Sequence, residues 1–106
     1  MLDDVTNLKS LLSRPDLVCQ QAFVAGDWVD AKDGKTFDVV NPARGDVIAS
    51  VADLSRAEIT TAIAAAEKAR HAWAAQTGKF RAQILRKWFD LLMANQEDLA
   101  IIMTAE

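Results

Sequence analysis

The sequence predicts an α+β fold, in which a small antiparallel sheet of about four short strands is followed by three packed helices. Residues 21–52 alternate apolar and polar side chains between turns that contain glycine or proline, which is typical of short strands. Residues 55–106 instead place apolar side chains at helical spacing. Residues 1–20 form a polar lead-in with short helical pieces. The length of 106 residues suits one domain.

The lead-in predicts two short helices. The leucines between residues 8 and 12 share one helical face, and Thr6 or Asn7 is a candidate cap. Pro15 interrupts this helix, and its fixed φ suits the first turn of a second one. Because isolated helices of this length are marginal in water, the lead-in needs a surface on which to dock.

A tight hairpin is expected between strands over residues 22–24 and 28–30. Gly26 and Asp27 suit the central positions of a type II′ turn, whereas a central Ala25-Gly26 pair would need another turn type. The hairpin therefore has two possible registers, and the pattern favours the first.

A second pair of strands is expected over residues 36–40 and 47–51. Asn41-Pro42 ends the first of them, because proline has no amide donor and restricts the residue before it to extended geometry. Apolar side chains then alternate again up to Val51.

The first long helix begins with a capping box at Ser55 and Glu58, in which each side chain satisfies a free amide. Helical spacing of the apolar residues predicts that this helix runs to about Ala74. Those residues are Ile59, Ala62, Ile63, Ala66 and Trp73.

Two further helices are predicted, capped by Thr77 and Asn95, with Glu97 and Asp98 in the first turn of the last one. The first of these helices has a wide apolar stripe formed by Phe80, Ile84, Leu85, Trp88, Phe89, Leu91 and Leu92. In the last helix Leu99, Ile102 and Met103 are expected to face inward. The chain ends at Glu106 within this helix and without a C-cap glycine, which is the pattern of a truncated chain. We therefore expect residues 1–106 to be a single incomplete domain.

The composition excludes several classes of function. A formal net charge of −3 and a pI near 5.1 argue against nucleic-acid binding, which usually needs a basic face. The N-terminus lacks the positive region of a signal peptide, and no apolar run is long enough to cross a bilayer. Cys19 is the one cysteine, so an intramolecular disulfide is excluded. These features predict a cytoplasmic protein without a membrane partner.

Isolated polar residues were weighed as catalytic or metal-binding groups. Cys19 has no basic residue close by in sequence and is expected to be a small buried or half-buried thiol. His71 has too few companion ligands for a metal site and is expected to be solvated near a helix end. Asp27, Asp30 and Asp33 lack the glycine and terminal glutamate of a calcium loop, so turn chemistry explains them better.

Three wider patterns were weighed as binding sites. Gly26, Gly34, Gly45 and Gly78 form no phosphate-binding loop. The aromatic residues Trp73, Phe80, Trp88 and Phe89 could line a groove, but at helical spacing they favour a core. The basic residues Arg81, Arg86 and Lys87 could bind an anion, but a solvated helix face is favoured.

Taken together, four stretches resemble the N-terminal segment of the NAD(P)-dependent aldehyde dehydrogenases. The stretches are AFVAGDWV, FDVVNPARGDVIASV, the alanine-rich helix ending in RHAW, and FRAQILRKWFDLLMANQEDLAIIMTAE. The resemblance runs from Gln20 to Glu106 and is closest to the succinate-semialdehyde dehydrogenases, with the glutarate-semialdehyde enzymes also similar. Ala25 departs from the asparagine often found before the turn glycine. Gly78-Lys79-Phe80 departs from a polar, helix-favouring stretch.

The resemblance implies a complete enzyme that oxidises succinate semialdehyde, or a similar semialdehyde, to the acid with NAD or NADP. It implies that this segment forms an outer layer of the cofactor-binding domain of a dimer or tetramer. The family's cysteine nucleophile, glutamate base and glycine-rich loop would all lie beyond the position matching Glu106. No catalytic, cofactor-binding or metal-binding residue is therefore assigned in this chain, and Cys19 inherits no role. We expect the chain alone to bind no cofactor and to be inactive.

Two functions remain open. The chain is either the leading part of a semialdehyde dehydrogenase, partnered by the remainder of that enzyme, or a free-standing assembly module derived from the same fold. In both cases unpaired strand edges and an uncovered apolar stripe predict self-association into a homo-oligomer.

Overall fold

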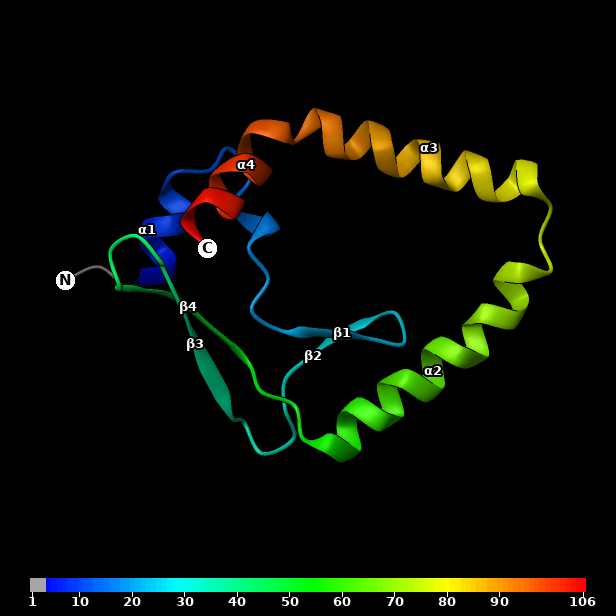
Figure 1. The fold of residues 1–106 in the computed structure, drawn as a ribbon, viewed down its shortest axis with the longest axis horizontal. Coiled ribbons are helices and arrows are strands. Elements are labelled where there is room, and N and C mark those ends of the chain that lie inside the picture. Colours follow the sequence, from blue (N-terminus) through cyan, green and yellow to red (C-terminus); the bar gives the residue numbers. More distant parts are fainter. Residues whose placement is uncertain (1–3) are drawn as a thin grey trace.

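The computed structural model describes residues 4–106 and confirms the α+β class (Figure 1). Four short strands precede three helices, as the sequence predicts. The elements are α1 (Asp4–Ser10), η1 (Pro15–Leu17), β1 (Ala22–Val24), β2 (Asp27–Val29), β3 (Thr36–Val40), β4 (Val47–Ala52), α2 (Arg56–Ala74), α3 (Gly78–Ala94) and α4 (Gln96–Ala105).

The strands form two separate antiparallel pairs, β1–β2 and β3–β4, where one small sheet was expected. Strand β4 pairs with β3 and also forms hydrogen bonds with the lead-in, but it does not pair with β1 or β2. The backbone N–H of Ala52 donates to the Gln20 carbonyl at 2.8 Å, and Gln20 Nε2 donates to the Ser50 carbonyl at 3.0 Å. An irregularity between Val39 and Val40 shifts the β3–β4 register near the Asn41-Pro42 corner.

The first hairpin has the register that the sequence pattern did not favour. Val24 pairs with Asp27, so the central pair of the turn is Ala25-Gly26, and the expected Gly26-Asp27 pair was wrong. Both central residues have positive φ, 51° at Ala25 and 90° at Gly26, as a type I′ turn requires. This turn matches the twist of the strands and brings Phe23 opposite Trp28, with ring centroids 5.1 Å apart.

The lead-in docks on the β3–β4 pair, and its helix α1 packs on β4. Because α1 begins at Asp4, the predicted caps Thr6 and Asn7 lie inside the helix. Pro15 occupies the first turn of η1, as predicted. The expected leucine face is only partly buried, since Leu11 remains 64% exposed. The buried apolar residues are Leu8, Leu12, Ala31, Ile48 and Ala49.

Local signals place the helices accurately. Ser55 and Glu58 form the predicted capping box, and α2 ends at Ala74 as expected. The Thr77 hydroxyl accepts a hydrogen bond from the Phe80 amide at 3.1 Å and caps α3. Asn95 stands before α4 as predicted, but its side chain donates back to the Leu91 carbonyl at 2.8 Å and does not cap α4.

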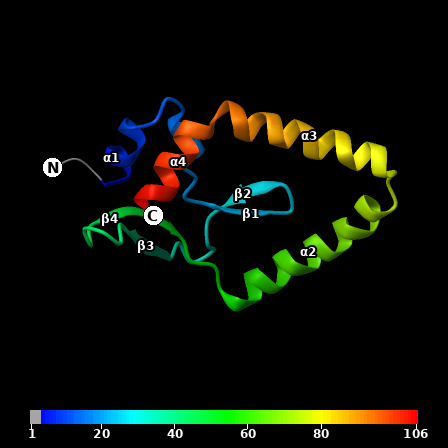
Figure 2. The same cartoon turned by 45° about the horizontal axis from the view of Figure 1, so that its top comes forward.

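The helices differ from the expected packed set. Figures 1 and 2 show α2 and α3 as two arms joined by a bend: α2 leaves the strands, α3 runs back from the bend, and α4 returns to the lead-in. The structure describes every residue of α2 and α3, and none of them is buried. The extents of 51 × 35 × 20 Å reflect this open arrangement. Residues 4–106 provide no second layer for the apolar stripe, so its side chains remain exposed.

The three residues of α4 that were expected to face inward differ in burial. Leu99 and Ile102 are half-buried, whereas Met103 is 72% exposed. None of the described helices combines the length and apolar character that a membrane span requires.

Candidate functional site

A buried carboxylate joins the two ends of the chain. Asp98, in the first turn of α4, is 6% exposed. Its Oδ1 accepts the Ser13 backbone N–H at 3.0 Å and its Oδ2 accepts the Arg14 backbone N–H at 2.8 Å. Hydrogen bonds to an ionised acceptor are stronger than neutral ones, so this contact fixes α4 on the lead-in.

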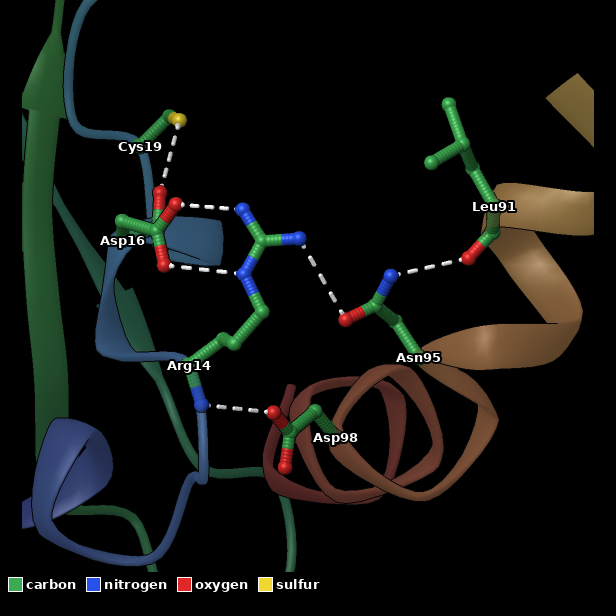
Figure 3. Close-up of polar contacts among 6 residues, drawn as sticks. All are labelled: Arg14, Asp16, Cys19, Leu91, Asn95 and Asp98. Carbon is green, nitrogen blue, oxygen red and sulfur yellow. Dashed lines mark hydrogen bonds and ion pairs between the residues drawn. The ribbon is translucent and has the colours of Figure 1, made fainter.

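Arg14 extends this junction toward α3 (Figure 3). Its guanidinium donates through Nε and Nη2 to the Asp16 carboxylate at 3.3 and 2.7 Å, and through Nη1 to the Asn95 side chain at 3.5 Å. The hydrogen bond from Arg14 lowers the pKa of Asp16, and the same bond raises the pKa of Arg14. Both side chains are exposed, so the pair orients the junction more than it stabilises the fold.

Cys19 lies at the edge of this junction but has no activating partner there. The thiol is exposed, and its Sγ lies 3.7 Å from the Asp16 carbonyl oxygen (Figure 3). A reactive thiol needs a cation or helix N-terminus that favours the thiolate, whereas a carbonyl oxygen accepts from the neutral thiol. The expectation of a buried or half-buried thiol was therefore wrong, because Cys19 lies in the connection between η1 and β1 and its side chain is exposed there.

His71 lies on the exposed side of α2. Its Nε2 is 3.5 Å from Glu67 Oε1, and its side chain is 70% exposed. The other partner of Glu67 is Arg70, whose hydrogen bond lowers the pKa of Glu67. This is a solvated ion-pair cluster near the helix end, as the sequence indicates.

Of the three aspartates expected in turns, Asp33 makes a turn contact, whereas Asp27 is the first residue of β2. Asp33 Oδ1 accepts the Lys35 backbone N–H at 3.0 Å, which is an Asx-type turn contact. Gly34 between them has a φ of 73°. Within residues 4–106, no group of three His, Cys, Asp or Glu side chains is arranged to hold a metal ion.

The basic residues of α3 are partly engaged within the helix. Arg86 Nε lies 3.5 Å from Asp90 Oδ1, and its guanidinium stands 5.0 Å from the Phe89 ring centroid. Arg81 is half-buried, while Lys87 is exposed. The three side chains therefore form no uniform cationic patch, in line with the expected solvated face.

The apolar stripe of the arms is a candidate binding surface. On α3 it includes all seven predicted residues, each at least 42% exposed, and Trp88 reaches 61%. On α2, Ile59 and Ile63 are 48% and 64% exposed. We call these residues of α2 and α3 the apolar arm face. Contiguous apolar surface of this kind marks a protein interface. The stripe favoured as a core is thus exposed within this chain.

The Asp98 junction is the feature that sequence reasoning missed. Asp98 was predicted only as an acidic residue that complements the dipole of α4. Its partners lie 84 and 85 residues earlier in the chain, so no local spacing signals the contact. The assignment of no catalytic or cofactor-binding residue stays a prediction.

Comparison with known proteins identifies relatives of this segment. The sequence model described as the aldehyde dehydrogenase family matches residues 28–106. A glutarate-semialdehyde dehydrogenase of Pseudomonas aeruginosa is 55% identical over 87 residues, which cover 82% of this chain and 18% of the relative. A succinate-semialdehyde dehydrogenase (NADP(+)) of Escherichia coli is 48% identical over 95 residues, covering 90% of this chain and 20% of the relative.

A solved structure agrees with the fold. The crystal structure of an aldehyde dehydrogenase from Brucella melitensis biovar abortus matches with a TM-score of 0.84 and 54% identity, over 89% of this chain and 20% of that one. The chain therefore spans about a fifth of the length of the relatives it matches. Because the family match covers most of the described elements, from β2 to α4, this chain belongs to the aldehyde dehydrogenase family.

Proposed function

We propose that this chain is the N-terminal part of a semialdehyde dehydrogenase that oxidises succinate or glutarate semialdehyde to the acid with NAD or NADP. The names of a glutarate-semialdehyde and a succinate-semialdehyde dehydrogenase among the relatives support this substrate class. Both substrates are short aldehydes that carry a carboxylate at the other end. In this proposal the remainder of the enzyme supplies the nucleophile, the base and the cofactor site.

The single observation that carries the proposal is the apolar arm face on a segment that matches a fifth of each relative. A water-exposed row that includes Phe80, Ile84 and Trp88 is unfavourable, since burying each such side chain contributes about 1.5–3 kcal/mol. In the proposal the remainder of the dehydrogenase covers this face, and the segment serves as its outer layer. The chain alone is then inactive and binds no cofactor.

A chimera tests this proposal. The matching N-terminal segment of the Escherichia coli relative is replaced by this chain, and oxidation of succinate semialdehyde is followed by formation of reduced NADP. We expect activity in the chimera and none in the isolated chain. A chimera that folds and assembles like its parent but lacks activity would contradict the proposal, as would activity of the isolated chain.

The second candidate function is a free-standing assembly module. The same apolar arm face favours it, because a second copy of the chain could cover that face. A module needs no further catalytic part. It would form a defined homo-oligomer when purified alone, and the chimera would be inactive. The combination of these two results separates the module from the dehydrogenase segment.

A further inference from the structure

The three long helices form an arch, residues 56–105, that is attached to the rest of the chain at both ends. Figures 1 and 2 show this arch leaving the strands at the start of α2 and returning to the lead-in at α4. We call residues 4–52, which contain α1, η1 and the strands, the body. The middle of the arch, formed by α2 and α3, has no buried residue.

The first attachment is the capping glutamate of α2. Glu58 Oε1 accepts the Lys32 backbone N–H at 2.7 Å, and its Oε2 accepts the Ser55 backbone N–H at 2.7 Å. Only three residues separate the end of β4 from the start of α2. This end of the arch is therefore held by covalent connection as well as by hydrogen bonds.

The second attachment has no such covalent support. The residues Ser13 and Arg14 lie 85 and 84 positions before Asp98, so α4 is held on the body by non-covalent contacts alone. Asp98 uses one oxygen for each of these two amides, and it is the one buried charged residue among those described. A buried carboxylate with matched donors is specific, because removing either partner leaves an unsatisfied group.

We propose that Asp98 is the latch that closes the arch. It fixes α4 on the lead-in and thereby sets the direction of α3 relative to the strands. The Arg14 side chain supports the latch by bonding Asn95, the residue that links α3 to α4. When the latch opens, α3 and α4 swing away, while the body and the cap of α2 stay in place. The latch therefore determines the angle at which the chain presents its apolar arm face.

Hydrogen exchange on the unchanged chain is the first test, because it depends on no variant. The Ser13 and Arg14 amides lie outside α1 and η1, so an open latch would leave them unprotected. A closed latch is expected to slow their exchange about tenfold or more, together with the amides of α4. Exchange of these two amides at the rate of an unstructured chain would overturn the proposal.

A distance measurement is the second test. Spin labels are placed on the exposed Cys19 of the body and on Lys87→Cys in α3, and the labelled chain is diluted with unlabelled chain so that only pairs within one molecule contribute. Asp98→Asn replaces one acceptor oxygen by an amide that faces a backbone N–H. We expect this variant to broaden and lengthen the distance distribution while helix content by circular dichroism is retained.

The matched control is Glu97→Gln, which removes the same charge one residue earlier at an exposed position. It is expected to keep the distribution of the parent chain. An unchanged distribution in Asp98→Asn, or an equal change in Glu97→Gln, would overturn the latch. If Asp98→Asn loses its helix content, the exchange measurement on the unchanged chain decides the question.

Discussion

At the scale of single residues, the turn of the first hairpin places a methyl group in an unfavourable backbone conformation. Ala25 has a φ of 51°, a region in which an L side chain crowds the following carbonyl. Asparagine tolerates that region better than alanine, through local hydrogen bonding. The hairpin therefore forms in spite of Ala25, because Gly26 and the paired strands favour the type I′ turn.

We predict that Ala25→Asn stabilises the β1–β2 hairpin. A non-glycine residue in the left-handed region costs about 1–2 kcal/mol, and we expect asparagine to recover about 1 kcal/mol of it. Urea denaturation monitored by tryptophan fluorescence measures the gain, with Trp73→Phe and Trp88→Phe in both chains so that the signal comes from Trp28. Ala43→Asn, at an exposed turn position without positive φ, is the control and should show no comparable gain. A destabilised Ala25→Asn chain would mean that the turn has another conformation in solution.

At the scale of elements, the cap of α2 connects a helix to a distant loop. The Glu58 carboxylate serves the Ser55 amide within the capping box and the Lys32 amide after β2. The backbone hydrogen bond from Ser55, followed by that from Lys32, lowers the pKa of Glu58. One side chain thus fixes both the start of the helix and its place beside the first hairpin.

We predict an acid-dependent loss of stability at this cap. A carboxyl whose pKa is lower in the folded chain stabilises the fold fully above its unfolded pKa, near 4.3, and loses that contribution as pH falls through the folded value. The temperature midpoint of unfolding, followed by circular dichroism, should therefore fall as the pH is lowered below the unfolded pKa. Glu58→Gln should lower the midpoint at neutral pH and flatten its acid dependence. Glu106→Gln, at the exposed chain end, is the control and should retain the steep dependence.

At the scale of the whole molecule, the open arch leaves more apolar surface exposed than a separate domain normally does. Within residues 4–106 the apolar arm face stays exposed, and the two strand pairs do not join into one sheet. Water exposure of such surfaces favours association with another protein surface. The isolated chain is therefore expected to associate with itself when the remainder of an enzyme is not present.

We predict that Trp88→Lys reduces this self-association. Trp88 is 61% exposed in the middle of the apolar arm face, and a lysine there places a charge in any interface that covers it. Light scattering should show a smaller mass, and an apolar dye should bind less. Gln83→Lys adds the same side chain at an exposed polar position of α3 and serves as the control. A parent chain that is a monodisperse monomer without dye binding would contradict self-association.

The sequence predicted the elements well and the contacts between them poorly. The Ser55–Glu58 cap, the Thr77 cap and the end of α2 at Ala74 all depend on residues within about one helical turn, so local spacing reveals them. The hairpin register was missed because Gly26 suits two turn types, and strand pairing selects between them. The sequence also predicted three packed helices, which the structure does not show. An apolar stripe predicts burial, but it does not specify which surface buries it.

By itself, the sequence determined the order of strands and helices, the caps of α2 and α3, and the membership of the aldehyde dehydrogenase family. These properties follow from neighbouring residues and from motifs that lie within single elements. Only the tertiary structure decided that the strands pair as two hairpins, that α2 and α3 stand apart, and that Asp98 joins α4 to Ser13 and Arg14. The physical reason is distance along the chain, because a hydrogen bond between groups more than eighty residues apart depends on how the whole chain folds.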